Sequence, residues 1–212
     1  MIEFKPEKLS RSKIQQLTEE FRSYYKYAKK VPVEVEELIE LELKIEIIPD
    51  FGLKQKAGVE AFISKNLKQI RVDNNEYQRN TLSNRYRFTL AEEIGHLWLH
   101  RKIYEQGVRY DSTEEFINDY KKMDEDDLNW IEFQAREFAG RLLVPKDVLE
   151  LKILEMKEAI NKFHEKYNGS DESIDLVKEP VAKKICHHFG VSWEVIRNRF
   201  RAENLEHMFL PE

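Results

Sequence analysis

The chain has 212 residues, which is enough for one large domain or two small ones. Hydrophobic residues make up 41% of it and aromatic residues 11%, so a core can be buried and wholesale disorder is not expected. Its charged residues, 35% of the total, nearly cancel to a net charge of −5, which argues against a protein that mainly coats nucleic acid or anionic membranes.

The compartment is indicated by cysteine usage and by the apolar segments. Cys186 is the single cysteine, so no internal disulfide can form, which fits a reducing compartment. The N-terminal residues lack the apolar run of a signal peptide, and no stretch approaches the ~20 apolar residues of a membrane-spanning helix. We therefore expect a soluble cytoplasmic protein with no membrane partner.

The first 80 residues show two helical patterns and then three strand-like patterns. The predicted ranges are 10–30 and 32–43 for the helices, and 43–49, 58–63 and 69–72 for the strands. Ser64-Lys65-Asn66 is the predicted hairpin turn between the last two strands, and Asp73-Asn74-Asn75 is expected to close the sheet.

From Asn84 onward the chain is predicted to be almost all helix, with one polar loop over 168–175. The predicted helices are 84–101, 113–121, 127–142, 146–167, 178–189 and 192–203. A small early sheet beside later helices is an α+β arrangement. We expect one domain over 1–212, made of N-terminal helices and sheet (about 10–80), site helices (84–167) and a C-terminal helix-turn-helix-like element (178–203).

The helix predicted over 84–101 carries the residues that suggest chemistry. It is apolar around most of its surface, so it should be buried, yet it contains Glu92, Glu93, His96 and His100. Positions 92, 96 and 100 are spaced four residues apart and share one face, which Glu93 borders. Leaving a buried carboxylate unpaired is costly, so these acids require a metal ion, an arginine or a proton.

Two segments carry a resemblance to a known family. The segment Arg87–His100, RFTLAEEIGHLWLH, resembles the zinc-site helix of ImmA/IrrE-like metallopeptidases, whose pattern is approximately R-F-T-L-A-H-E-x-G-H-x-x-L-H. The segment Glu132–Pro145, EFQAREFAGRLLVP, is similar to their second site helix, approximately E-x-x-A-N-x-F-A-x-x-L-L-x-P. The resemblance extends over at least residues 31–203. It implies a zincin-like helical core and a metal-dependent endopeptidase, with a regulatory protein such as a helix-turn-helix repressor as its substrate.

The resemblance also assigns roles by motif position. It makes Glu93 the general base, and Glu92, His96 and Glu132 the metal ligands, with Zn²⁺ as the expected ion. Two carboxylates form a harder ligand set than histidines, so Mn²⁺ and Fe²⁺ are alternatives. Two residues depart from the pattern: Glu92 replaces the first histidine, and Arg136 stands where the family usually has Asn or Asp.

These departures leave two hypotheses open. In the first, the Glu92 carboxylate is an oxygen ligand and the metal is retained. In the second, Arg136 pairs with Glu92 where the metal would lie, and the fold persists as a catalytically silent regulator that binds a protein partner. The retained Glu93 favours the first hypothesis, because a site without catalysis has no need to bury a second carboxylate. A guanidinium group found in that space would count against it.

Plainer interpretations exist for two of these residues. Glu132 and Arg136 are four residues apart and could form an ordinary ion pair on a helix surface. His100 lies near a helix end, where a histidine can interact with the last carbonyl groups, and this is preferred to a ligand role.

The segment 181–203 has the pattern of helix, glycine turn and helix, and arginines make its second helix basic. DNA binding is therefore a distant third hypothesis. Trp193, Ile196 and Phe200 give the second helix an apolar face, and the chain as a whole is acidic. Packing against the protein is preferred, and direct DNA binding is not expected.

Overall fold

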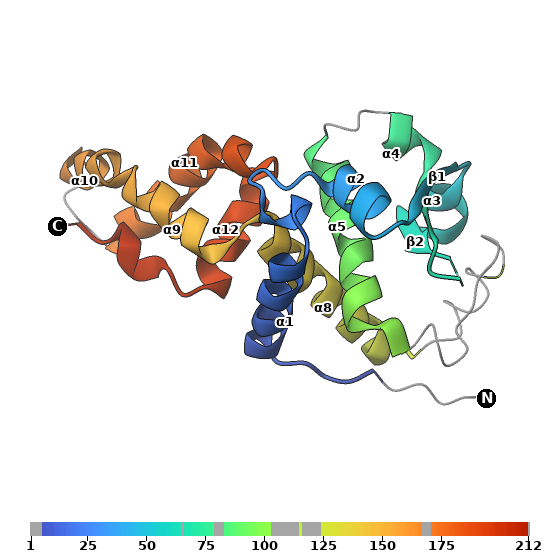
Figure 1. Ribbon diagram of the computed structural model, residues 1–212. Helices are drawn as coiled ribbons and strands as arrows, with labels where there is room; N and C mark the ends of the chain where they lie inside the picture. The colour runs from blue at the N-terminus through green and yellow to red at the C-terminus, as the bar shows by residue number, and fades with distance from the viewer. Residues whose placement is uncertain are drawn as a thin grey trace. The chain divides into compact units, whose positions relative to one another are not determined.

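The computed structural model describes residues 6–64, 66–78, 83–102, 115, 124–166 and 171–211 (Figure 1). They form a mainly helical structure with one small sheet early in the chain, which confirms the predicted α+β class. The chain divides into two compact units, Met1–Leu142 and Leu143–Glu212. No helix in the described part of the chain combines the length and apolarity that a bilayer crossing demands.

The first unit contains the sheet and the helices that carry the predicted site. Its helical elements are α1 (Arg11–Tyr24), η1 (Tyr27–Lys29), α2 (Val35–Glu37), η2 (Leu38–Glu42), α3 (Leu53–Ala57), α4 (Asn74–Gln78), α5 (Asn84–Leu99) and α8 (Glu125–Leu143). Its strands are β1 (Glu46–Asp50), β2 (Ala61–Ile63) and β3 (Gln69–Asp73). The helix predicted over 113–121 lies outside the described residues apart from Glu115.

The helix α1 is shorter than the predicted range 10–30. The Ser10 hydroxyl caps it by accepting a hydrogen bond from the backbone N–H of Lys13 at 3.2 Å. It ends at Tyr24, after which the backbone is extended. On its buried face Phe21 meets Trp98 of α5 and Phe138 of α8 edge-on, with ring centroids 5.1 and 5.4 Å apart. The helix α1 therefore packs against both helices that carry the predicted site, α5 and α8.

The sheet has the strand order β1-β3-β2. β1 runs parallel to β3, whereas β2 and β3 are antiparallel, as a hairpin requires. In the connection, Leu67 adopts a φ of 58° and its N–H donates to the carbonyl of Ser64 at 2.9 Å. The three predicted strands are confirmed with shifted ends, and Lys65 of the predicted turn lies outside the described residues.

The short helix α4 begins at Asn74, within the segment 73–75 that was predicted to close the sheet, and the short helix α3 was not predicted. Both depend on the buried carboxylate of Asp73. One of its oxygens accepts from the N–H of Lys54 at 2.9 Å, and the other accepts from the N–H of Asn75 at 3.0 Å. One aspartate thus satisfies backbone donors in the first turns of two helices that precede and follow the hairpin.

The second unit is helical throughout its described part. Its elements are α9 (Lys146–Leu154), α10 (Lys157–Lys166), α11 (Asp171–Phe189), α12 (Trp193–Ala202) and η3 (Glu206–Phe209). The single helix predicted over 146–167 is wrong, because a turn at residues 155–156 divides it. The predicted polar loop over 168–175 is also wrong from residue 171 onward, since α11 begins there and continues through Pro180.

The predicted glycine turn is confirmed between α11 and α12, where Gly190 has a φ of 62°. Among the arginines of α12, Arg199 is buried and forms an ion pair with Glu203 at 2.5 Å. Arg197 and Arg201 are the exposed members of the set. A buried, paired arginine cannot contact a phosphate backbone. Arg199 therefore does not support the DNA-binding hypothesis, which was based on the arginines of this helix.

Candidate active site

The helix α5 carries three of the predicted site residues, Glu92, Glu93 and His96, in an apolar setting. It starts after Ser83, whose hydroxyl accepts from the N–H of Tyr86 at 3.1 Å. Its apolar residues Leu90, Ala91 and Ile94 are fully buried. Glu93 is 6% exposed and His96 is 8% exposed. The sequence prediction that polar groups are buried in this helix is therefore confirmed.

A glycine lets α5 and α8 approach each other closely at this level. A Cβ atom added to Gly95 would lie 2.9 Å from the carbonyl oxygen of Ala135 and 3.3 Å from Cβ of Phe138. Such contacts are shorter than van der Waals separation, so only glycine permits this spacing. The close crossing brings side chains of α5 within reach of acids on α8.

His96 and Glu132 meet across this crossing. Nε2 of His96 lies 3.8 Å from Oε1 of Glu132. On the other side of the ring, Nδ1 of His96 lies 3.3 Å from Nδ1 of His100. When His96 donates the shared N–H, its Nε2 is unprotonated and turned toward Glu132, which is the form that a metal ligand requires.

Both histidines are neutral near pH 7. Burial, with a smaller contribution from the charge of Arg136, lowers the pKa of His96 to about 4. Burial, together with the neighbouring His96 ring, lowers the pKa of His100 to about 3. Two neutral rings can share one N–H, so the contact with His100 orients His96 without adding charge.

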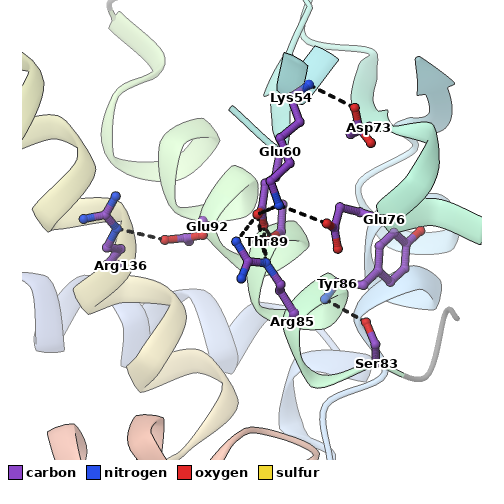
Figure 2. A network of polar contacts seen from close by, with 10 residues as sticks. All are labelled: Lys54, Glu60, Asp73, Glu76, Ser83, Arg85, Tyr86, Thr89, Glu92 and Arg136. Atoms are coloured by element: carbon purple, nitrogen blue, oxygen red, sulfur yellow. Dashed lines mark hydrogen bonds and ion pairs between the residues drawn. The ribbon is translucent and has the colours of Figure 1, made fainter. Parts of the chain in front are cut away.

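Arg136 lies against the acids of both helices. Its Nε is 3.2 Å from Oε1 of Glu92 on α5, as Figure 2 shows, and its Nη2 is 3.6 Å from Oε2 of Glu132 on α8. The Arg136 side chain is 62% exposed, whereas those of Glu92 and Glu132 are 22% and 27% exposed. The guanidinium group thus covers two partly buried carboxylates from the solvent side, and this finding counts against the hypothesis that a metal ion is retained.

Burial raises the pKa of all three site carboxyls. It raises that of Glu92 to about 7, although the charge of Arg136 opposes the shift. It raises the pKa of Glu93 well above the usual range, and the charges of Glu132 and Glu92 add to this effect. The pKa of Glu132 is raised by burial against the opposing charge of Arg136. Three neighbouring acids with raised pKa values form a site that takes up cations or protons readily.

The predicted ligands fit a divalent metal in kind. Carboxylate oxygens and a neutral imidazole nitrogen are ligands that Zn²⁺, Mn²⁺ and Fe²⁺ accept. The structure brings His96 and Glu132 together, but Glu92 is held by Arg136. Within the described ranges, no group of three or more His, Cys, Asp or Glu side chains is arranged so that it could hold a metal ion. The arrangement as described therefore offers two of the three ligands.

A second polar cluster, centred on Glu60, was not predicted from the sequence. It reaches α5 at Thr89, about one helical turn before Glu92 and Glu93. Glu60, just before β2, accepts hydrogen bonds from Arg85 at 2.8 and 2.9 Å, from Lys54 at 2.7 Å and from Thr89 at 3.1 Å (Figure 2). Burial raises the pKa of Glu60, but the hydrogen bonds from Arg85 and Lys54 outweigh it and lower the pKa to about 2. The ionised carboxylate fastens α5 to the sheet side of the unit.

Comparison with protein families finds a match over both site helices. The model of the Peptidase_M78 family, described as the IrrE N-terminal-like domain, matches residues 76–201, which is more than half of the chain. A search of curated proteins finds no match.

Proposed function

The chain belongs to the Peptidase_M78 family of IrrE N-terminal-like domains, and from that premise we propose that it is a metal-dependent endopeptidase. Its fold is metallopeptidase-like, as the family match indicates. The proposed substrate is a regulatory protein such as a helix-turn-helix repressor, which follows from the resemblance of its two site helices. Fold membership alone does not determine activity, which depends on the residues of the site.

The observation that carries this proposal is the approach of His96 to Glu132. Nε2 of the one lies 3.8 Å from Oε1 of the other, and the two residues come from different helices. A neutral imidazole and a carboxylate from a second helix are what a hydrolytic metal site of this type needs. A fold kept only for packing has no need of this arrangement beside the buried Glu93.

Each residue has a proposed task. His96, Glu132 and Glu92 would hold the ion, and His100 would orient the His96 ring through their 3.3 Å contact. A bound divalent ion supplies a water of lowered pKa. Glu93 in its ionised form would take up the proton, and its burial makes that carboxylate a stronger base than an exposed glutamate.

The test replaces the proposed base. Glu93→Gln should abolish cleavage of a purified helix-turn-helix repressor in the presence of Zn²⁺ or Mn²⁺, followed on gels over time, while co-purification with the repressor persists. Glu125→Gln, at the exposed start of α8, is the control and should cleave like the parent. If Glu93→Gln cleaves as fast as the parent protein, the assignment of the base is wrong.

A second candidate function is favoured by the contacts of Arg136. Because its guanidinium lies against Glu92 and Glu132, the protein could bind a partner through the same region without hydrolysing it. Elemental analysis of protein purified without added metal or chelator separates the two functions. One equivalent of a transition metal supports the peptidase, and its absence together with partner binding supports the silent regulator.

A further inference from the structure

Arg136 is placed so that its side chain can leave the site without any movement of the helices. Its side chain is 62% exposed, and it lies on the solvent side of two less exposed carboxylates. Arginine has a long flexible stem, and an exposed ion pair contributes little to stability. A divalent ion that gains two carboxylates and an imidazole would bind far more strongly than the guanidinium does.

The departure of Arg136 would also free the missing ligand. Glu92 contacts Nε of Arg136 at 3.2 Å and, within the described ranges, belongs to no cluster of three possible ligands. His96 and Glu132 already face each other at 3.8 Å. Only the side chain at position 92 therefore has to turn for the set to assemble, and it lies on the same face of α5 as His96.

We propose that Arg136 is an internal, displaceable cation that closes the site and competes with the metal ion. In the closed form the guanidinium bridges Glu92 and Glu132. In the open form Arg136 extends into solvent and the two carboxylates join His96 around a divalent ion. This inference rests on the proposed function and adds its regulation: the apparent affinity for metal is the intrinsic affinity multiplied by the open fraction.

The test is a calorimetric titration of the chelator-treated full chain with Zn²⁺. Arg136→Asn, which places the family's usual residue at this position, should bind Zn²⁺ at least about fivefold more tightly than the parent protein. Arg136→Lys keeps the charge but replaces the planar guanidinium, which meets Glu92 through Nε and Glu132 through Nη2, by a single ammonium nitrogen, so its affinity should lie nearer to that of the Asn variant. An affinity of the Lys variant equal to that of the parent protein would mean simple charge repulsion and would overturn the bridge.

A matched control is available in Arg85, which is 66% exposed and contacts Glu60 instead of the site acids. Arg85→Gln should change the Zn²⁺ affinity by less than about twofold. If Arg136→Asn and the parent protein bind one Zn²⁺ equally tightly, the competition is overturned while the peptidase proposal stands. If neither protein binds Zn²⁺, nor Mn²⁺ or Fe²⁺ in the same titration, both proposals fail. Circular dichroism of each variant verifies that it is folded.

Discussion

The guanidinium of Arg136 and the carboxylate of Glu92 are in contact at 3.2 Å, although the residues are 44 positions apart and lie on different helices. These are the two positions at which the chain departs from the pattern of the resembling family. The contact gives the departures a common physical reason, because a carboxylate in place of a neutral histidine adds a negative charge that a guanidinium can balance. The two substitutions should therefore be treated as one change.

Replacing Glu92 by Gln should stabilise the metal-free protein selectively at higher pH. The pKa of this carboxyl is about 7 in the folded protein against 4.5 as its ordinary value, so the folded state holds the proton longer and wild-type stability falls as pH rises between these values. Relative to the parent protein, Glu92→Gln should gain about 1–3 kcal/mol between pH 4.5 and pH 8. Urea denaturation in the presence of chelator measures this, with the exposed Glu40→Gln as control. A pH-independent difference would contradict the buried setting of Glu92.

Glu60→Gln should show the opposite pH dependence. The pKa of Glu60 is about 2 in the folded protein, below the ordinary 4.5, so its stabilising effect is present above pH 4.5 and disappears as pH falls toward 2. At pH 7 the variant should be less stable by about 1–3 kcal/mol, and the difference should shrink at pH 4 and again at pH 3. Urea midpoints at the three pH values decide the matter. A deficit that persists undiminished at pH 3 would show that packing, and not charge, is lost.

Gly95→Ala should destabilise the protein although alanine is the better helix former. The added Cβ would lie 2.9 Å from the carbonyl oxygen of Ala135, so α5 and α8 must move apart. We expect a loss of about 1–3 kcal/mol by urea denaturation, despite the ~1 kcal/mol gained in helix propensity. Adding Ala135→Gly should not restore stability, because the blocking atom belongs to the backbone. A more stable Gly95→Ala variant would mean that the helices are further apart than described.

The sequence could predict the site residues that belong to the two helical motifs, on α5 and α8. The apolar surround of α5 and the spacing of its acids and histidines indicate a buried polar face, and the second motif places Glu132 on another helix. Their approach at 3.8 Å agrees with that expectation. The role of Glu60 could not be predicted in this way. Its partners include Thr89, 29 positions away, and no local sequence pattern indicates a contact over that separation.

The errors in secondary structure have a similar origin. The break between α9 and α10 contains no glycine or proline, and its turn is made by the N–H of Met156 donating to the carbonyl of Ile153 at 2.9 Å. The predicted helix starts at residue 178, but α11 begins at Asp171 and continues through Pro180. The helices α3 and α4 depend on Asp73, whose carboxylate reaches Lys54 from 19 positions away. Tertiary contacts override local propensity at each of these places.

The buried ion pair of α12 gives a prediction for the second unit. Arg199 and Glu203 have side chains only 5% and 3% exposed, and their charged atoms are 2.5 Å apart. Arg199→Met should cost about 3–5 kcal/mol, because it removes the guanidinium that lies 2.5 Å from the buried Glu203 carboxylate. The double variant Arg199→Met/Glu203→Leu should recover most of that loss, since no charge remains to be compensated. A double-mutant cycle by urea denaturation measures the coupling, with Lys183→Met in the exposed pair with Glu179 as the control that should change little. Strictly additive effects of the two single substitutions would contradict a coupled, buried pair.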